Sequence, residues 1–173
     1  MFCHCTARPA TPGTTGALDD HPAVIARPPR IAYLLLGIGP ILGWLWPLSP
    51  LPAGSAPVLR YGIGAGLAAL GVLVMALGVR AFRKAGTNVE TPKPATALVI
   101  EGIYAWSRNP MYISLVLLFA AVAVLANSAW LALLLVLYMG VLRVGVIARE
   151  ECYLERKFGD GYRAYRARVG RWL

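Results

Sequence analysis

Most of the side chains suited to ligand binding in this 173-residue chain lie in two short segments. Residues 101–112 contain tyrosines, an arginine and an asparagine, and residues 143–155 contain arginines and two adjacent glutamates. Such groups bind polar or charged ligands through ion pairs, hydrogen bonds and aromatic ring faces. Both histidines, His4 and His21, lie far from these segments in the sequence. These segments therefore contain no nucleophile–base triad built on histidine.

The second segment contains a charge inside apolar sequence. Apolar residues run from 111 to 148, and Arg143 is the one charged residue among them. An arginine within a membrane span is costly, which makes it a functional candidate by default. Arg143 and Glu150 are seven residues apart and would share one face of a regular helix. The alternative is that Arg143 reaches the membrane surface and that Glu150 and Glu151 are ordinary solvated charges.

Composition predicts the kind of fold that positions these segments. Hydrophobic residues make up 58% of the chain and charged residues 14%, whereas soluble domains carry roughly 25% charge. The apolar residues form blocks long enough to cross a bilayer core of about 30 Å. In lipid the backbone must satisfy its own hydrogen bonds, so such blocks are helices. We predict an all-α membrane protein of about four transmembrane helices, with a C-terminal helical hairpin and an amphipathic C-terminal segment.

Residues 1–30 differ from the rest of the chain. They contain five prolines and no continuous apolar run, which predicts a disordered tail. Cys3-His4-Cys5 within the tail resembles part of a metal site, but no further ligands accompany it, so we predict no metal. Residues 31–173 are expected to form a single domain. Its four spans are predicted at about 31–48, 61–80, 111–126 and 129–148.

The last apolar stretch is too long for one crossing. As one helix it would extend about 57 Å, nearly twice the bilayer core. The polar pair Asn127-Ser128 lies midway and predicts the turn of a helical hairpin. The hairpin would bring the two chemically capable segments together at one membrane face. In the second span, Gly62 and Gly66 are expected to form a small-residue face for helix packing.

The C-terminal segment after residue 148 has an amphipathic pattern. Apolar and aromatic residues recur at spacings of three and four, and basic residues occupy the other faces. Gly159-Asp160-Gly161 is expected to separate two helical pieces. The apolar stripe consists of Leu154, Phe158, Tyr162, Tyr165 and Val169.

The distribution of basic residues predicts the orientation in the membrane. The net charge is +9, and the arginines and lysines gather in the tail, the loop at 83–110 and the C-terminal segment. The opposite connections contain only Arg60. Positively charged loops stay cytoplasmic, so both termini, the middle loop and the site are expected on the cytoplasmic side of the inner or plasma membrane. This topology accounts for the charge without nucleic acid.

Two motifs carry a family resemblance. EGIYAWSRNPMYI (101–113) and REECYLERKFGDGYRAYRARVGRWL (149–173) together resemble the isoprenylcysteine carboxyl methyltransferase family, which forms a wider group with the phospholipid N-methyltransferases. The resemblance covers about residues 83–173 and suggests a small, bacterial-type member. It implies an integral membrane methyltransferase that uses S-adenosyl-L-methionine. The family binds this cofactor in a cytoplasm-facing pocket, and a lipophilic substrate reaches it from the bilayer.

The resemblance also implies site residues. The loop and the helix after it would line the cofactor pocket, and the adjacent glutamates would contact the cofactor from the other side. Arg143 and Arg149 are the candidate catalytic residues. The candidate cofactor-binding residues are Ala97, Leu98, Val99, Tyr104, Arg108, Asn109, Pro110, Met111, Tyr112, Glu150 and Glu151.

The chain departs from the eukaryotic pattern at three positions. Asn109 and Thr96 replace histidines, and Val146 replaces the arginine that holds the prenylcysteine carboxylate. The motifs therefore support S-adenosyl-L-methionine as the methyl donor better than they support a prenylcysteine as the acceptor. Arg143 is a possible substitute for the missing arginine. Arg108 has two alternatives to a cofactor carboxylate, because it could pair with Glu101 or Glu151.

We predict a methyltransferase acting on a small lipophilic acceptor, whether carboxylate, thiol or amine. The alternatives are a phospholipid N-methyltransferase or a non-catalytic membrane subunit that retains the scaffold. The expected partners are a lipophilic or lipid-linked substrate and membrane lipid, with no nucleic acid. The oligomeric state is left open.

Overall fold

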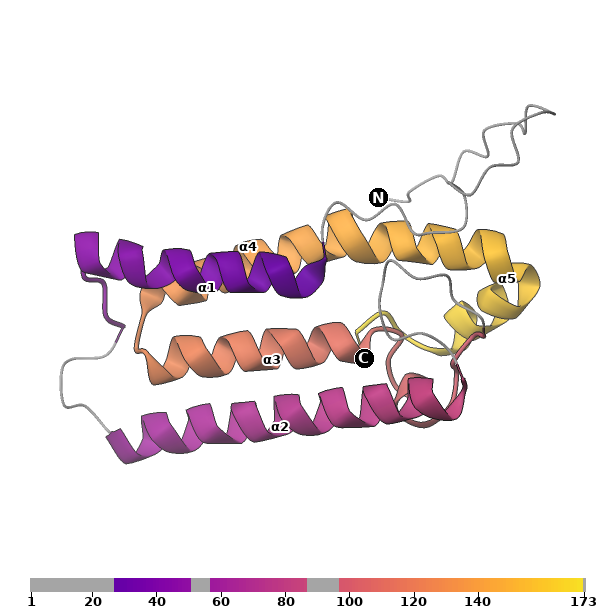
Figure 1. Cartoon of the computed structure of the whole chain (residues 1–173), viewed down its shortest axis with the longest axis horizontal. Helices are drawn as coiled ribbons and strands as arrows, with labels where there is room; N and C mark the ends of the chain where they lie inside the picture. The colour runs from indigo at the N-terminus through magenta and orange to yellow at the C-terminus, as the bar shows by residue number, and fades with distance from the viewer. Residues whose placement is uncertain (1–26, 51–56, 87–96, 173) are drawn as a thin grey trace, which may run out of the picture.

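The computed structural model describes residues 27–50, 57–86 and 97–172, and within these ranges the fold is all-α. The predicted fold class is confirmed. The predicted tail, Cys3-His4-Cys5 and Thr96 lie outside the described residues, except for the last four residues of the tail. The elements in chain order are α1 (Pro28–Leu45), α2 (Pro57–Lys84), the 3₁₀ helix η1 (Gly102–Ala105), α3 (Pro110–Leu125), α4 (Ala129–Val141), the π-helical segment η2 (Leu142–Ile147) and α5 (Ala148–Arg168) (Figure 1).

The helices lie side by side along one long axis, with α3 between α2 and α4 (Figure 1). α3 and α4 form the predicted hairpin, and the chain reverses at Asn127-Ser128. Asn127 takes a left-handed conformation with φ of 47°. The Ser128 hydroxyl caps α4 by accepting a hydrogen bond from the backbone N–H of Leu131 at 3.3 Å. The predicted hairpin is therefore confirmed.

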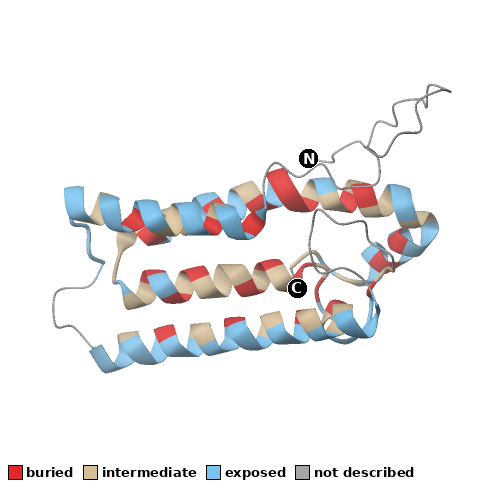
Figure 2. Cartoon of the chain, viewed as in Figure 1, coloured by how far each residue is buried: buried red, intermediate tan, exposed pale blue. Residues whose placement is uncertain are grey.

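The outer surface of this arrangement is apolar. Three helical stretches of the described residues are long and apolar enough to cross a membrane: α1, α2 and the continuous helix 129–168. α3 is apolar but has only 16 residues. The outer faces of α1 and α2 are largely exposed, with Trp44 at 83% and Val58 at 85% (Figure 2). Exposed apolar surface of this extent suits lipid rather than water, and the chain is an integral membrane protein.

The predicted packing face of α2 is wrong. A β-carbon placed on Gly62 or Gly66 would meet nothing within 4 Å. The close contacts occur instead at Gly64, Gly71 and Gly78, which face Leu125, Leu118 and Met111 of α3 respectively. Residues seven apart return to one helix face after two turns, so these three glycines form the seam. Their missing side chains let the two backbones approach closely.

The apolar core lies between α1, α3 and α4. Tyr138, Leu142 and Val146 are completely buried there. The Tyr138 hydroxyl donates a 3.2 Å hydrogen bond to the carbonyl oxygen of Pro28 and so fixes the beginning of α1. Pro40 is accommodated inside α1.

The last helix changes direction at the predicted break. Gly159 has φ of 51° and ψ of −124°, which interrupts the helical geometry inside α5. Glycine adopts this left-handed φ without the steric cost that a β-carbon would add. After the bend the chain returns toward the N-terminal end of α3, beside which the C-terminus lies (Figure 1). The apolar stripe is turned inward at Tyr162 and Tyr165, which are buried.

The glycine seam makes a first prediction. Gly71→Ala would place a methyl group 2.9 Å from the Leu118 side chain and 3.2 Å from the Ser114 carbonyl oxygen. We expect the free energy of unfolding to fall by about 1–3 kcal/mol from overpacking. Gly66→Ala on the open face is the matched control and should be neutral or stabilising by about 0.5–1 kcal/mol. Denaturant unfolding in detergent micelles measures both, and equal changes would contradict the assigned seam.

Candidate functional site

A buried carboxylate joins three segments at the N-terminal end of α3. Glu151, in the first turn of α5, is 7% exposed. Its Oε1 lies 2.9 Å from the Arg108 guanidinium in the loop and 3.0 Å from Nε of Arg171 near the C-terminus. A second contact joins Arg171 to Oε2 of the same carboxylate. A buried charge is tolerated when it is paired and hydrogen-bonded on both oxygens, as here.

The C-terminal segment also docks on the loop through its backbone. The Arg108 amide donates to the carbonyl oxygen of Gly170 at 3.0 Å, and Asn109 Nδ2 donates to that of Arg171 at 2.9 Å. The Tyr165 hydroxyl donates to the carbonyl oxygen of Tyr104 at 2.7 Å. Arg108 is therefore the partner of Glu151 rather than of Glu101, which lies 3.8 Å from Lys84 on the surface.

The neighbouring Glu150 has a different environment. Its Oε2 accepts a 2.7 Å hydrogen bond from the Tyr112 hydroxyl in the first turn of α3. Among the described residues, no donor contacts its other oxygen, Oε1. Glu150 is thus held through one oxygen only, by Tyr112.

Burial raises the pKa of Glu150 from 4.5 to about 7. The hydrogen bond from Tyr112 opposes this rise in the pKa, and the negative charge of Glu151 adds to it. The group therefore titrates near neutral pH. Burial also raises the pKa of Tyr104, with smaller contributions from Tyr165 and Glu150. Tyr104 is consequently a neutral phenol at physiological pH and lies close enough to Glu150 to respond to its charge.

Tyr104 is positioned by the short helix η1 and by the end of α2. Gly102, with φ of 63°, permits the turn into η1. The Tyr104 ring packs edge-on against Phe82, with centroids 5.3 Å apart. Its hydroxyl lies 3.9 Å from the point where a β-carbon of Gly78 would stand. Just before η1, Ala97 and Leu98 are partly buried and Val99 is buried, while Pro110 and Met111 begin α3 beside this site.

Both candidate catalytic arginines are exposed, whereas Glu150 is partly buried and Glu151 is buried. The expectation that Arg143 and Glu150 share a face assumed a regular α-helix, and η2 intervenes between them. A π turn contains about one residue more than an α turn, so a spacing of seven no longer repeats the face. Arg143 is exposed and forms no ion pair with a described residue. Arg149 is also exposed, and the catalytic role of both arginines stays a prediction.

Several site residues were not predicted from the sequence. Tyr162, whose hydroxyl lies 3.3 Å from Arg108, and Tyr165 were assigned only to the apolar stripe. The predicted break at Gly159 was the available signal, because a reversal there returns later residues to the loop. Ser107, whose hydroxyl donates to the carbonyl oxygen of Arg171 at 3.4 Å, and Arg171 itself lie within the two family motifs but were not among the candidate site residues.

The docking of the C-terminal segment makes a second prediction. Arg171→Gln removes one charged partner of buried Glu151 and should lower the free energy of unfolding by about 1–3 kcal/mol. Limited proteolysis should then release the C-terminal residues earlier. Arg168→Gln is the control, because Arg168 is exposed and contacts only the carbonyl oxygen of Ala164. A surface change of this kind costs within about 0.5 kcal/mol, and equal losses in the two variants would refute the docking role.

Comparison with known proteins supports one family. The model of the phospholipid methyltransferase family matches residues 59–161, more than half of the chain. A protein of Haemophilus influenzae described as uncharacterized is 49% identical over 65 residues, which is 36% of this chain and the whole of that protein. No solved structure matches the chain.

The matched residues run from the beginning of α2 past the break at Gly159. They include the glycine seam, the loop with Tyr104, the first turn of α3 with Tyr112, and both glutamates. The match begins earlier than the resemblance at 83–173, and it supports the wider group without singling out the isoprenylcysteine carboxyl methyltransferases. The chain belongs to the phospholipid methyltransferase family of membrane methyltransferases.

Proposed function

We propose that this protein transfers a methyl group from S-adenosyl-L-methionine to a lipophilic acceptor carrying a carboxylate, thiol or amine. The observation that carries the proposal is the pairing of Tyr112 with Glu150 beside Tyr104, in a chain of a methyltransferase family. Two segments far apart in the sequence supply these groups, and the hairpin brings them together.

The side chains present fit this cofactor. S-adenosyl-L-methionine has a sulfonium cation, an amino-acid end and an adenosine. The open Oε1 of Glu150 suits a ribose hydroxyl or an ammonium, and the neutral Tyr104 ring suits a cation. Nε of Arg108 is buried without a hydrogen-bond partner, so a donor remains for a carboxylate.

The contacts separate five of the predicted cofactor-binding residues into two groups. We assign cofactor contact first to Glu150 and Tyr104, and to Tyr112, whose hydroxyl holds Glu150. Asn109 and Glu151 are engaged in docking the C-terminal segment, so their effect on the cofactor is through the shape of the site.

When bound, S-adenosyl-L-methionine would supply an electrophilic methyl group to the nucleophilic oxygen, sulfur or nitrogen of the acceptor, with S-adenosylhomocysteine as the leaving product. The protein contributes orientation and exclusion of water, which methyl transfer needs more than acid–base groups. The docked C-terminal segment supports both, because it closes the loop against α5. By the positive-inside rule we place this site on the cytoplasmic side.

The acceptor is the less determined partner. Val146, at the position of the family's carboxylate-binding arginine, is completely buried in the core and cannot serve that role. Arg143 in η2 and Arg149 in α5 are exposed, and they are the remaining candidates for binding an anionic acceptor. Radiolabelled methyl transfer into total lipid, into lipophilic thiols and into prenylcysteine-type carboxylates separates the acceptor classes.

A third prediction tests the cofactor. Purified protein in nanodiscs should bind S-adenosylhomocysteine saturably, and Glu150→Gln should weaken binding at least about tenfold because a charge-assisted hydrogen bond is lost. Glu155→Gln on the same helix is the matched control, since among the described residues Glu155 pairs with Arg163 and Arg166 and not with the site. Absence of saturable binding by the folded wild-type protein would refute the proposed methyltransferase function. Binding without methyl transfer to any acceptor would favour a non-catalytic subunit.

A fourth prediction concerns pH. The Glu150 carboxylate must be ionised to bind an ammonium or accept from a hydroxyl at full strength, and its pKa is about 7. Affinity for S-adenosylhomocysteine should therefore rise as the pH increases from about 6 to 8. Tyr112→Phe removes the hydrogen bond that lowers the pKa of Glu150. The midpoint of the affinity–pH curve should therefore shift to higher pH in this variant. Titration calorimetry across this range measures both, and a flat wild-type profile would contradict the role of Glu150.

A further inference from the structure

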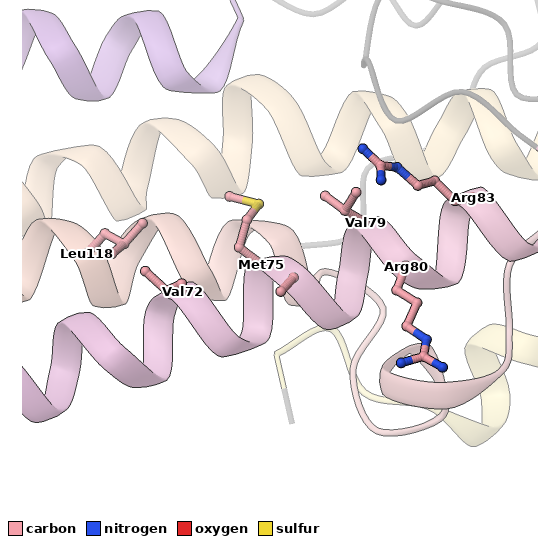
Figure 3. Close-up of a pocket in the computed structure, with 7 residues that line it drawn as sticks. Val72, Met75, Val79, Arg80, Arg83 and Leu118 are labelled. Atoms are coloured by element: carbon pink, nitrogen blue, oxygen red, sulfur yellow. The ribbon is translucent and has the colours of Figure 1, made fainter.

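A groove of about 560 Å³ runs along the seam of α2 and α3, outside the site described above (Figure 3). None of the candidate cofactor-binding residues lines it. Its walls are apolar, and two arginines stand at one end. The lining residues are Val72, Met75, Ala76, Val79, Arg80 and Arg83 of α2 and Leu118 of α3.

The apolar part of the groove opens on the outer surface of the helix bundle. Val72 is 59% exposed, and Ala76 is exposed beside it. Because α2 approaches α3 closely at Gly71, Leu118 forms the opposite wall at this level. In a membrane protein such a surface faces hydrocarbon, and a channel bounded by aliphatic side chains fits an acyl chain.

At the charged end of the groove, the two arginines are not paired with an acidic side chain of the described residues. Arg80 and Arg83 are both exposed, and no described residue forms an ion pair with either. Their guanidinium groups extend on the two sides of α2 at the groove's end (Figure 3). The adjacent Lys84, by contrast, lies 3.8 Å from Glu101. Guanidinium groups bind phosphate oxygens through paired hydrogen bonds, and basic pockets beside membrane helices select anionic headgroups.

We propose that this groove binds an anionic phospholipid. One acyl chain lies along Val72, Ala76 and Leu118, and the anionic headgroup lies at the end of the groove that Arg80 and Arg83 line. A zwitterionic lipid is a poorer fit, because it brings no net negative charge to two uncompensated arginines. The order of apolar walls followed by cations along α2 matches the order of chain and headgroup along a lipid. The proposal does not depend on methyl transfer.

Native mass spectrometry of the detergent-purified full chain tests the proposal. Phosphatidylglycerol and phosphatidylcholine with identical acyl chains are titrated in parallel. We expect phosphatidylglycerol to bind about tenfold more tightly. The double variant R80Q/R83Q should lose this preference, whereas R156Q/R168Q, which removes two exposed arginines of α5, should keep it. Equal binding of the two lipids by the wild-type protein, or equal losses in the two double variants, would overturn the proposal.

A second pair of variants tests the acyl-chain channel. Ala76→Trp fills the groove without changing its charge and should reduce phosphatidylglycerol binding at least about fivefold. Leu73→Trp is the control, because Leu73 is exposed on α2 but does not line the groove. If Ala76→Trp binds phosphatidylglycerol as tightly as Leu73→Trp does, the lipid does not occupy this groove and the proposal fails.

Discussion

The buried carboxylate of Glu151 is the constraint on which the site depends. A charge that is 7% exposed is tolerated only with partners, and here the partners come from two other segments, through Arg108 and Arg171. The loop, the beginning of α5 and the C-terminal segment must therefore assemble together. If the loop or the C-terminal segment moves away, buried Glu151 loses one of its two arginine partners. The same pairing fixes the neighbouring backbone, and with it the direction of Glu150.

Two adjacent glutamates, Glu150 and Glu151, thus have different environments. Successive residues on a helix point about 100° apart, so Glu150 and Glu151 meet different partners. Glu151 is saturated by arginine, whereas Glu150 accepts one hydrogen bond from Tyr112. Burial, together with the charge of Glu151, keeps the pKa of Glu150 near neutrality. Proteins commonly give two nearby carboxyl groups different pKa values by placing them in different environments.

The sequence was sufficient to predict the hairpin and the break at Gly159, because both rest on local chemistry. A polar pair inside a long apolar run is stable at the membrane surface, where the chain can turn. A glycine-rich sequence such as Gly159-Asp160-Gly161 interrupts a helix. The packing face of α2 was not predictable, since α2 offers several small-residue stripes. The choice among them depends on Leu118 and Leu125 of another helix. The π segment has no residue-type signature, and it moved Arg143 out of phase with Glu150.

The depth of the site follows from the unequal lengths of α2 and α3. α3 begins beside Gly78, since Met111 contacts that position, whereas α2 continues for six more residues to Lys84. Six residues correspond to about 9 Å of helix. The basic residues Arg80, Arg83 and Lys84 are expected at the membrane surface, so the Tyr112–Glu150 pair is expected close to that surface. In the proposed enzyme, a lipophilic acceptor would reach such a site from the bilayer, and the cofactor would enter from the aqueous side.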